Sequence, residues 1–431
     1  MRTLYSWLIR GAAPLAFAVV LWRGLRDRSY WQGLTERFGF GPAVHSSPTI
    51  WLHAVSLGEM SAAAPLIRAL RARHPNVPLV LTSATPAGRA RAHALFGDTV
   101  DIRYLPYDTR GSVRRFLARV RPRFAIIMET ELWPNLFDAC ERGGIPVMLA
   151  SARLSARSVA RYRRFARLFS GVFTDNVLIA AQSADDAQRF QAIGAPPANI
   201  HVIGNVKYDL QLDAAAVDRG RQLRAAYGTA RPVWIAGSTH AGEEEQVLEA
   251  HSLLLAERPN ALLLLVPRHK DRFAGVAEVL SRRGVAFARR SGDSLPQAAT
   301  AVLLVDTLGE LQMLYAAADI AFVGGSLVPI GGHNLLEPAA LGLPVLTGPH
   351  HFNGKEVAEL LLARGAAFEV ADAPALAQRL RALFDDVAER QRIGAKGQAI
   401  VDANRGSVAR LLALMEARLG AWPAANPSGA R

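Results

Sequence analysis

The feature that most restricts the fold is a pattern of short apolar runs alternating with amphipathic helical stretches, which occurs twice along 431 residues. Such apolar runs are typical of buried parallel strands, and the stretches between them predict βα units. The pattern starts near residue 49, pauses over a polar connection at residues 209–229, and then restarts. This length also exceeds one compact core. The sequence therefore predicts an α/β protein with two Rossmann-like domains that face a cleft.

The apolar runs give the expected strands and domain limits. In the first half we predict strands at Thr49–Ser56, Val77–Ser83, Phe124–Glu129, Ile145–Ala150, Val177–Ala181 and Ile200–Gly204. In the second half we predict strands at Pro232–Gly237, Ala261–Pro267, Ala301–Val305, Ile320–Val323 and Pro344–Thr347. We expect an N-terminal domain at residues 29–206 and a C-terminal domain at residues 207–422. A polar tail is expected at residues 423–431.

The charge distribution indicates an anionic partner for the first half. The net charge of +13 falls entirely on residues 1–205, while the basic and acidic residues of 206–431 balance. Nucleic acid, phospholipid and a phosphorylated glycolipid all fit such a basic half. A high-GC genome, whose proteins are generally rich in Arg, is the alternative cause of part of this positive charge. The single cysteine, Cys140, excludes a disulfide within the chain, and the histidines lack zinc-type spacing, so no metal is expected.

Residues 1–28 predict a membrane-anchoring segment. Leu4–Ile9 and Gly11–Trp22 are apolar, and arginines interrupt and follow them. The second piece is shorter than the roughly 20 residues that a spanning helix needs. We therefore expect an interfacial or marginally spanning anchor, with its arginines on the cytoplasmic side. A removed leader peptide and a buried first helix are the alternatives.

A glycine-rich segment, Gly324–Pro344, predicts a phosphate site. It follows the expected strand Ile320–Val323 and leads into a helix expected to begin near Asn334. Glycines allow close approach of the backbone, and free N–H groups at a helix start favour an anion. Glu337 could accept hydrogen bonds from a ribose diol. The spacing differs from the dinucleotide fingerprint, and an ordinary βα turn with a surface glutamate is the alternative.

Acidic residues follow two expected strands of the first half. Glu59 opens a helix directly after the first strand, where a helix N-terminus favours the ionised carboxylate. Such a carboxylate could take a proton from an attacking hydroxyl. Glu129 ends another strand, with Glu131 two residues later. A plain helix-opening role for Glu59, and a cap or an Arg partner for Glu129, are the alternatives.

Three further segments carry groups suited to an anionic ligand. Lys207 lies at the expected domain junction, Arg268 and His269 end a strand, and Asp306–Leu311 leads from a strand into a helix. The planar guanidinium of Arg donates two parallel hydrogen bonds to phosphate. The three strand ends of the second half are therefore expected to converge on one anionic ligand.

Five strings together resemble the bacterial 3-deoxy-D-manno-octulosonic acid (Kdo) transferases. They are H-A-V-S-L-G-E, M-E-T-E-L-W-P-N, G-N-V-K-Y-D, P-R-H and G-G-H-N-L-L-E-P-A-A. The resemblance extends from the N-terminal segment to about residue 420. It implies a GT-B fold, attachment to the cytoplasmic face of the inner membrane, and transfer of Kdo from CMP-Kdo to the lipid A precursor, lipid IVA, in lipopolysaccharide biosynthesis.

The resemblance also implies roles for individual residues. Glu59 matches the proton acceptor, and Glu129 and Lys207 match residues that stabilise the transition state. The positions that match CMP contacts are Arg268, His269, Gly309, Glu310, Leu311, Asn334, Leu335, Leu336 and Glu337. We expect direct displacement with inversion at the anomeric carbon, without a metal or cofactor.

Two other classes of function remain as alternatives. The chain could be another GT-B enzyme that uses a UDP-sugar, either a transferase or an epimerase. It could instead be a non-catalytic protein that binds a membrane surface or nucleic acid through its basic half. The second alternative leaves the phosphate-type loops unexplained and lacks interleaved aromatic residues, so no nucleic acid is expected. Arg89, Arg91, Arg153 and Arg157 are expected to meet the phosphates of the lipid acceptor.

Overall fold

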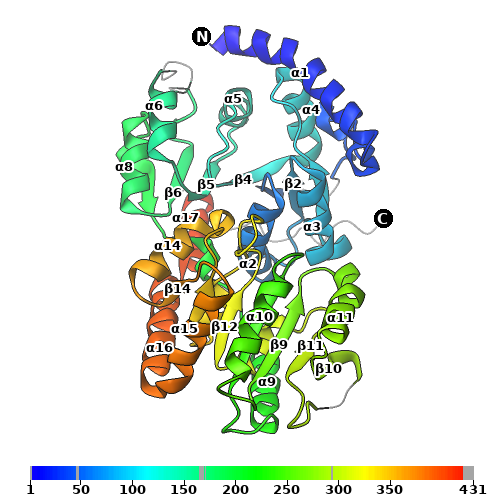
Figure 1. Ribbon diagram of the computed structural model, residues 1–431. Coiled ribbons are helices and arrows are strands. Elements are labelled where there is room, and N and C mark those ends of the chain that lie inside the picture. The colour runs from blue at the N-terminus through cyan, green and yellow to red at the C-terminus, as the bar shows by residue number, and fades with distance from the viewer. Residues whose placement is uncertain (1, 45–47, 165–168, 170, 293–294, 421–431) are drawn as a thin grey trace. The chain divides into compact units, whose positions relative to one another are not determined.

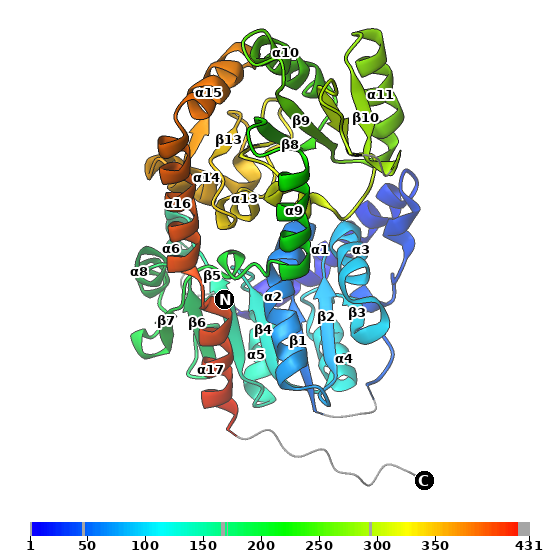
Figure 2. The same ribbon diagram turned by 90° about the horizontal axis from the view of Figure 1, so that it is seen from below.

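The chain forms two α/β units in the computed structural model, which describes residues 2–44, 48–164, 169, 171–292 and 295–420. Unit 1 comprises residues 1–209 together with 404–431, and unit 2 comprises residues 210–403. Each unit is a parallel sheet with helices on both faces (Figures 1 and 2). The predicted fold class of two parallel α/β domains is therefore confirmed. The predicted tail at 423–431 lies outside the described residues.

Within the described residues, unit 1 holds a seven-stranded parallel sheet with the order β3-β2-β1-β4-β5-β6-β7. The strands are β1 (Thr49–His53), β2 (Leu79–Ser83), β3 (Asp101–Tyr104), β4 (Pro122–Met128), β5 (Val147–Ala152), β6 (Val177–Ala181) and β7 (Ile200–Val202). The chain runs outward from β1 to β3 and then returns to β4, on the other side of β1. The switch point of this sheet, where ligands bind in doubly wound folds, therefore lies between β1 and β4.

Two apolar layers enclose the sheet of unit 1. The helices of the unit are α1 (Arg2–Gly24), α2 (Leu57–Arg73), α3 (Pro86–Phe96), α4 (Arg110–Val120), α5 (Pro134–Arg142), α6 (Ala156–Arg164), α8 (Ala184–Ala192) and α17 (Ser407–Leu419). Side chains of α2, α3 and α17 pack against one face, and those of α4, α5 and α8 against the other. Ser56 and Thr85 cap α2 and α3 through their hydroxyl groups, which fixes where these helices begin.

Unit 2 repeats the architecture over its described residues, with the strand order β10-β11-β9-β8-β12-β13-β14 in a parallel sheet. The strands are β8 (Val233–Thr239), β9 (Leu262–Pro267), β10 (Phe287–Arg289), β11 (Val302–Leu304), β12 (Ile320–Val323), β13 (Val345–Thr347) and β14 (Ala367–Glu369). The switch point of this sheet lies between β8 and β12.

The helices of unit 2 cover both faces of its sheet. They are α9 (Ala214–Ala226), α10 (Glu244–Leu255), α11 (Phe273–Arg282), α12 (Leu311–Ala316), α13 (Leu336–Ala340), α14 (Lys355–Ala363), α15 (Ala373–Asp385) and α16 (Val387–Asn404). Side chains of α10, α11 and α15 form one apolar layer, and those of α9 and α12 form the other. The central strands between these layers, such as β9 (Leu262–Pro267) and β12 (Ile320–Val323), are apolar throughout, as parallel strands buried on both faces require.

The C-terminal helix α17 belongs to unit 1, whereas we assigned residues up to 422 to the C-terminal domain. Leu411 and Met415 of α17 lie in the same apolar cluster as α2. The side chain of Asp209 accepts hydrogen bonds from the backbone N–H groups of Gly406 and Val408, at the start of α17. The chain thus returns to the first unit after completing the second. This arrangement depends on contacts between distant residues that a local pattern does not reveal.

Helix α1 lies against unit 1 through one side and exposes large apolar side chains on the other. Tyr5 and Ser6 donate hydrogen bonds to Asp108 and Asn135 at 2.8 and 2.7 Å. Phe17 contacts the ring of Phe38. Leu4, Trp7, Leu8, Leu15, Val19 and Trp22 are exposed. Of the described residues, only the segment Thr3–Gly24 forms a helix that is long and apolar enough to cross a membrane.

Candidate active site

Two of the predicted acidic residues follow the two strands that flank the switch point of unit 1. Glu59 lies in the first turn of α2, after β1, and Glu129 lies directly after β4. Glu131 and Lys207 belong to the same group, because the charges of Glu129, Glu131 and Lys207 all act on the carboxyl group of Glu59. The fold of unit 1 therefore brings together four charged residues from three segments that are far apart in the sequence.

Glu59 is held by the start of its own helix. Its backbone N–H donates to the Ser56 hydroxyl at 3.3 Å, and its carboxyl group accepts the N–H of Val55 at 2.9 Å. These contacts form a variant of the capping box. The pKa of Glu59 is raised to about 7, with burial as the largest cause; the charges of Glu129 and Glu131 add to the rise, and the Val55 hydrogen bond and Lys207 oppose it. Desolvation therefore outweighs the backbone hydrogen bond at the helix start, which favours the ionised carboxylate.

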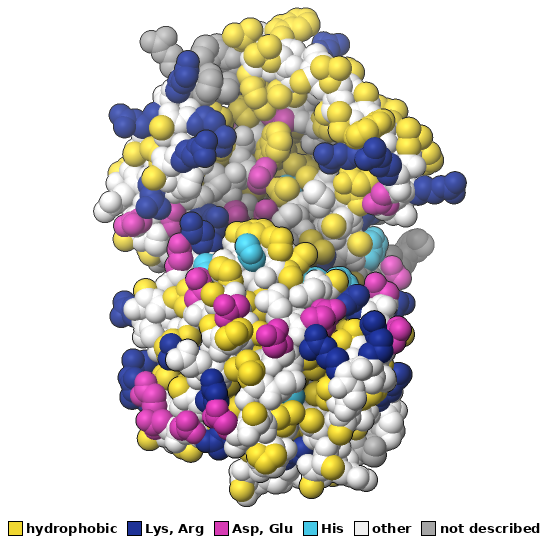
Figure 3. Space-filling view, in the orientation of Figure 1, with side chains coloured by type: hydrophobic (Ala, Val, Ile, Leu, Met, Phe, Trp, Pro, Cys, Tyr) yellow, Lys and Arg dark blue, Asp and Glu magenta, His cyan; other side chains and the backbone are white. Residues whose placement is uncertain are grey.

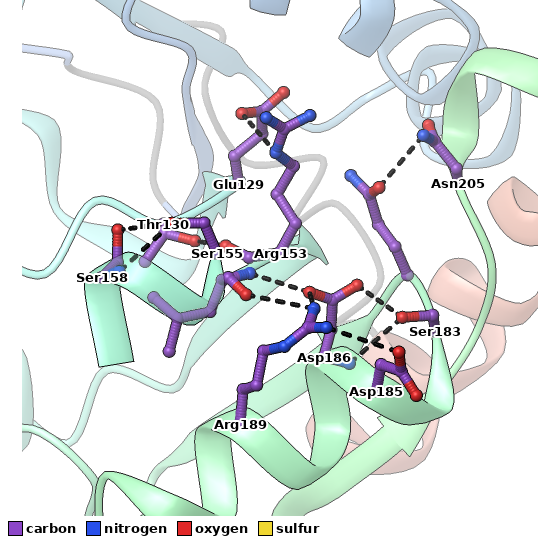
Figure 4. A network of polar contacts seen from close by, with 12 residues as sticks. Glu129, Thr130, Arg153, Ser155, Ser158, Ser183, Asp185, Asp186, Arg189 and Asn205 are labelled. Carbon is purple, nitrogen blue, oxygen red and sulfur yellow. Dashed lines mark hydrogen bonds and ion pairs between the residues drawn. The ribbon is translucent and has the colours of Figure 1, made fainter. Parts of the chain in front are cut away.

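Glu129 occupies a left-handed backbone conformation, with φ of 54°, immediately after β4. Its N–H donates to the carbonyl oxygen of Ala150 at 2.9 Å, which fixes the turn against β5. Its carboxylate lies 3.9 Å from the guanidinium of Arg153, and Figure 4 shows the two side chains directed toward each other. Burial raises the pKa of Glu131, and the charge of Glu129 adds to this rise. The turn therefore holds two carboxyl groups, one of which is paired.

A buried amide network positions the segment that carries Lys207. Gln182 donates to the carbonyl and hydroxyl oxygens of Ser151, and Asn205 donates to Gln182 at 3.0 Å. The side-chain oxygen of Asn205 in turn accepts the N–H of Lys207 at 3.0 Å. The network links the ends of β5, β6 and β7. Lys207 therefore lies in unit 1, in a short 3₁₀ turn (Val206–Tyr208) that its neighbours fix.

In unit 2, the predicted donor-site residues follow β9, β11 and β12. Arg268 and His269 are exposed after β9. Asn334 donates to Glu337 at 3.1 Å and accepts the N–H of Leu336 at 3.0 Å. Burial raises the pKa of Glu337, whereas Asn334 and Arg268 lower it, so the charge of Arg268 reaches this carboxyl group. Arg268, Asn334 and Glu337 thus belong to one polar region at the carboxyl ends of the strands.

The first N–H groups of the predicted phosphate segment after β12 are engaged within the protein. The carboxyl group of Glu243 is fully buried and accepts the N–H groups of Gly325, Ser326 and Leu327, at 2.7, 3.0 and 2.9 Å. The helix that follows, α13, begins at Leu336, close to the predicted start near Asn334, and it has only five residues. A side chain of the protein therefore already occupies these three N–H groups of the predicted phosphate segment, whereas an anion at the start of α13 stays a prediction.

The loop Gly309–Leu311, also predicted to contact the donor, leads from β11 into α12. Gly309 has a φ of 84°, which favours glycine. The carboxylate of Glu310 pairs with Arg290 at 2.9 Å and also accepts the hydroxyl of Thr307. The side chain of Glu310 is therefore engaged within the protein, and the exposed backbone at Gly309 is the part of this loop open to a ligand.

Comparison with known proteins identifies the family. The sequence model of the 3-deoxy-D-manno-octulosonic-acid transferases (kdotransferases) matches residues 32–210. The 3-deoxy-D-manno-octulosonic acid transferase of Haemophilus influenzae is 42% identical over 418 residues, 96% of this chain and 98% of that protein. The enzyme of that name from Bordetella pertussis is 39% identical, over 97% of this chain and 100% of that protein. The chain belongs to the Kdo transferase family.

This Kdo transferase shares its fold with other glycosyltransferases. A glycosyltransferase of Rickettsia africae superposes with a TM-score of 0.53 at 13% identity, over 88% of this chain and 100% of that structure. At that identity the likeness concerns the fold alone, and it agrees with the GT-B class predicted from the sequence. The resemblance stated from the five strings is confirmed, and the protein is a glycosyltransferase.

The arginines predicted to meet the lipid acceptor lie in different environments. Arg89 pairs with the carboxylate of Glu36 at 3.1 Å, where both side chains are largely buried. Arg91 donates to the hydroxyl of Ser61 at 2.9 Å. Arg157 is exposed on α6. Arg89 therefore has a structural role that the sequence did not indicate, whereas Arg157 lies on the solvent side of its helix.

Sequence reasoning missed three groups next to the donor region of unit 2. They are Glu243, already described, and the imidazoles of His240 and His333, which follow the two strands of the switch point. His333 stands inside the string G-G-H-N, so its position was a signal that we did not use. Among the described residues, no group of three or more His, Cys, Asp and Glu side chains could hold a metal ion. The expectation that the reaction needs no metal stays a prediction.

Proposed function

We propose that this Kdo transferase moves Kdo from CMP-Kdo to a sugar hydroxyl of lipid IVA, the lipid A precursor, in lipopolysaccharide biosynthesis. The reaction is a direct displacement that inverts the anomeric carbon. Unit 1 supplies the general base, Glu59, and unit 2 binds the donor. The observation that carries the proposal is the carboxyl group of Glu59, which follows β1 at the switch point and has a pKa raised to about 7.

The raised pKa suits Glu59 to proton abstraction. A carboxylate with a pKa near the working pH is ionised in a large fraction of molecules and still has a high proton affinity. When the acceptor hydroxyl attacks, Glu59 takes its proton, which contributes a factor of roughly 10²–10⁴ to the rate. We assign Glu129 and Lys207 to the charges that develop in the transition state, on the basis of the family resemblance and their electrostatic contact with Glu59.

In this proposal the donor binds mainly to side chains of unit 2 and not to the backbone N–H groups of residues 325–327. Because Glu243 occupies the N–H groups of residues 325–327, we assign the phosphate of CMP to Arg268 and His269. The guanidinium of Arg268 donates two parallel hydrogen bonds to phosphate oxygens. Glu337 accepts the ribose hydroxyls, and the backbone of Gly309–Leu311 contacts the base. Leu335 and Leu336 complete the set predicted from the family resemblance.

The acceptor is a phosphorylated lipid, and unit 1 offers surfaces of both required kinds. Arg157, Arg161 and Arg164 are exposed at positions of α6 that share one helix face. Figure 3 shows Lys and Arg side chains gathered over α6 and hydrophobic side chains over α1. Between them the surface is hollowed, with hydrophobic and acidic side chains inside. We propose that α1 enters the cytoplasmic face of the inner membrane and that α6 binds the phosphates of lipid IVA.

The test is incubation of the full chain with CMP-Kdo and lipid IVA in detergent micelles, followed by mass measurement of the lipid. We expect a gain of one or more Kdo residues, inhibition by CMP and none by UDP. The product should form equally in the presence of EDTA, because the proposed donor contacts are cationic side chains. An unchanged lipid mass, or inhibition by UDP in place of CMP, would overturn the proposal.

A further inference from the structure

Two histidines from loops on either side of the switch point of unit 2 are joined by a hydrogen bond. The Nε2 atoms of His240 and His333 lie 2.8 Å apart, and the planes of the two rings differ by 5°. Two imidazole nitrogens at this distance share one hydrogen, so one ring donates and the other accepts. Both side chains remain partly exposed. The pair therefore presents neutral but protonatable groups where ligands bind in doubly wound sheets.

The surrounding backbone is built to hold this pair. Gly325 has a φ of 70°, and a Cβ atom there would lie 3.1 Å from His333 and 3.4 Å from His240. Its carbonyl oxygen accepts the N–H groups of Gly331 and Gly332, immediately before His333. Glu243 accepts the N–H of Gly325 at 2.7 Å and that of His240 at 3.2 Å. One buried carboxyl group thus fixes the backbone beneath both imidazoles.

Cations surround the pair. Burial lowers the pKa of His240, and the charges of His269, Arg268 and Arg272 lower it further. Burial lowers the pKa of His333 to about 4, with contributions from His240, Arg268 and His269. The neighbouring carboxyl group of Glu243 is engaged by backbone N–H groups. The lowered pKa values of both rings favour a neutral pair, and the positive charges around it favour an anion.

We propose that His240 and His333 form an anion subsite for the donor, separate from Arg268, that takes the carboxylate of the transferred sugar acid. The inference rests on the proposed donor, because Kdo carries a carboxylate that common UDP-hexoses lack. An arriving oxyanion offsets the surrounding positive charge and draws a proton onto the pair. Both rings then donate to the anion, with the proton supplied by solvent. The subsite thus selects for a sugar acid.

The experiment replaces each histidine by glutamine, whose amide keeps a neutral donor and cannot take up a proton. KM for CMP-Kdo is measured at pH 6 and pH 8, and Kd for CMP is measured by calorimetry. In the wild type, KM for CMP-Kdo should be lower at pH 6 than at pH 8. In His240→Gln and His333→Gln, KM at pH 6 should rise about tenfold, the loss of one charge-assisted hydrogen bond, and its pH dependence should disappear.

The control variant is His93→Gln, which changes an exposed histidine of α3 in unit 1. An unchanged Kd for CMP in the two test variants assigns the subsite to the sugar carboxylate, whereas an equal rise in Kd assigns it to the phosphate. Unchanged KM and pH dependence in folded variants overturn the inference. A wild type that does not consume CMP-Kdo overturns the proposed function instead. If KM for CMP-Kdo rises equally at both pH values in a variant, the histidine has only a structural role. That result also overturns the inference of an anion subsite.

Discussion

The backbone N–H of Gly325 donates to the carboxyl group of Glu243 at 2.7 Å, although 82 residues separate the two in the sequence. The N–H groups of Ser326 and Leu327 donate to the other oxygen of the same group. A loop with this sequence pattern commonly binds a phosphate through its N–H groups. Here an internal carboxyl group takes that place. The loop is therefore shaped before any donor arrives, and Glu243 positions it.

Replacing Glu243 by glutamine should loosen this loop. The amide keeps only one of the two accepting oxygens. The backbone N–H groups that donated to the replaced oxygen lose their acceptor, at a cost of about 1–3 kcal/mol for each buried donor. We expect the free energy of unfolding to fall by about 2 kcal/mol or more, and KM for CMP-Kdo to rise. Urea unfolding and initial rates check both. Glu249→Gln, at an exposed position of α10, is the matched control and should change neither.

Replacing Glu59 by glutamine should abolish most of the turnover and leave donor binding intact. The amide cannot accept the proton of the attacking hydroxyl, so kcat should fall by a factor of about 10²–10⁴. In the wild type, kcat/KM should rise with pH and level off above the pKa of about 7, because only ionised Glu59 acts as a base. Calorimetry with CMP measures donor binding, and initial rates from pH 5.5 to 8.5 give the profile.

A flat pH profile, or a glutamine variant with near-normal turnover, would exclude Glu59 as the base. The stability of the protein provides a second readout. Folding raises the pKa of Glu59 above its usual value, so its contribution to folding stability becomes less favourable as pH rises from about 4.5 to about 7. The glutamine variant lacks this dependence. The melting temperature of the variant minus that of the wild type should therefore increase as pH rises from about 4.5 to about 7.

The sequence predicted the central strands and the edge strand β7, and missed the other three strands at the sheet edges. The missed strands are β3, β10 and β14, each of which ends a sheet. Edge strands are buried less and carry charged residues. Arg103 and Asp101 pair within β3, and Arg289 and Glu369 end the other two strands. Such segments lack the continuous apolar run that marks a strand buried on both faces.

The candidate site was predictable where a residue follows a strand, and not where distant contacts decide its state. Glu129 and Arg268 come directly after strands, and Glu59 lies in the first turn of the helix that follows β1, as their positions after apolar runs indicated. The raised pKa of Glu59 depends on burial and on Glu129 and Glu131, which only the folded sheet brings near. The carboxyl group of Glu243 comes from another loop, so the glycine pattern alone suggested a vacant phosphate site.

Reversing charge on α6 should weaken acceptor binding and leave donor binding unchanged. In the double variant Arg157→Glu and Arg161→Glu, two exposed cations become anions that repel the phosphates of lipid IVA. We expect KM for lipid IVA to rise at least about tenfold at low salt, with less effect at high salt because exposed charges are screened. Arg68→Glu, at an exposed position of α2, is the control. An equal rise in KM for CMP-Kdo would contradict the assignment of α6 to the acceptor.

The hydrogen bond from Tyr5 to Asp108 connects α1 to the start of α5. The carboxylate of Asp108 also accepts the N–H groups of Asn135 and Leu136, at 3.0 and 2.8 Å. The pKa of Asp108 is raised to about 6, because the effect of burial exceeds that of the hydrogen bonds from Asn135, Tyr5 and Leu136, which lower it. Asp108 is thus ionised at pH 8 and protonated at pH 5. The attachment of α1 should therefore be stronger at the higher pH.

Removing the hydroxyl in Tyr5→Phe tests this attachment. At pH 8 the variant loses a hydrogen bond to the ionised carboxylate of Asp108, worth about 1.5–3 kcal/mol. At pH 5 it loses a hydrogen bond to the neutral carboxyl group, worth about 0.5–1.5 kcal/mol. Amide hydrogen exchange of α1 in detergent micelles measures the local loss at each pH. Tyr30→Phe is the control, because Tyr30 contacts Arg23 through its ring. Equal losses at the two pH values would show that Asp108 does not govern how α1 is held, whereas a larger loss at pH 8 ties α1 to the segment that follows Glu131.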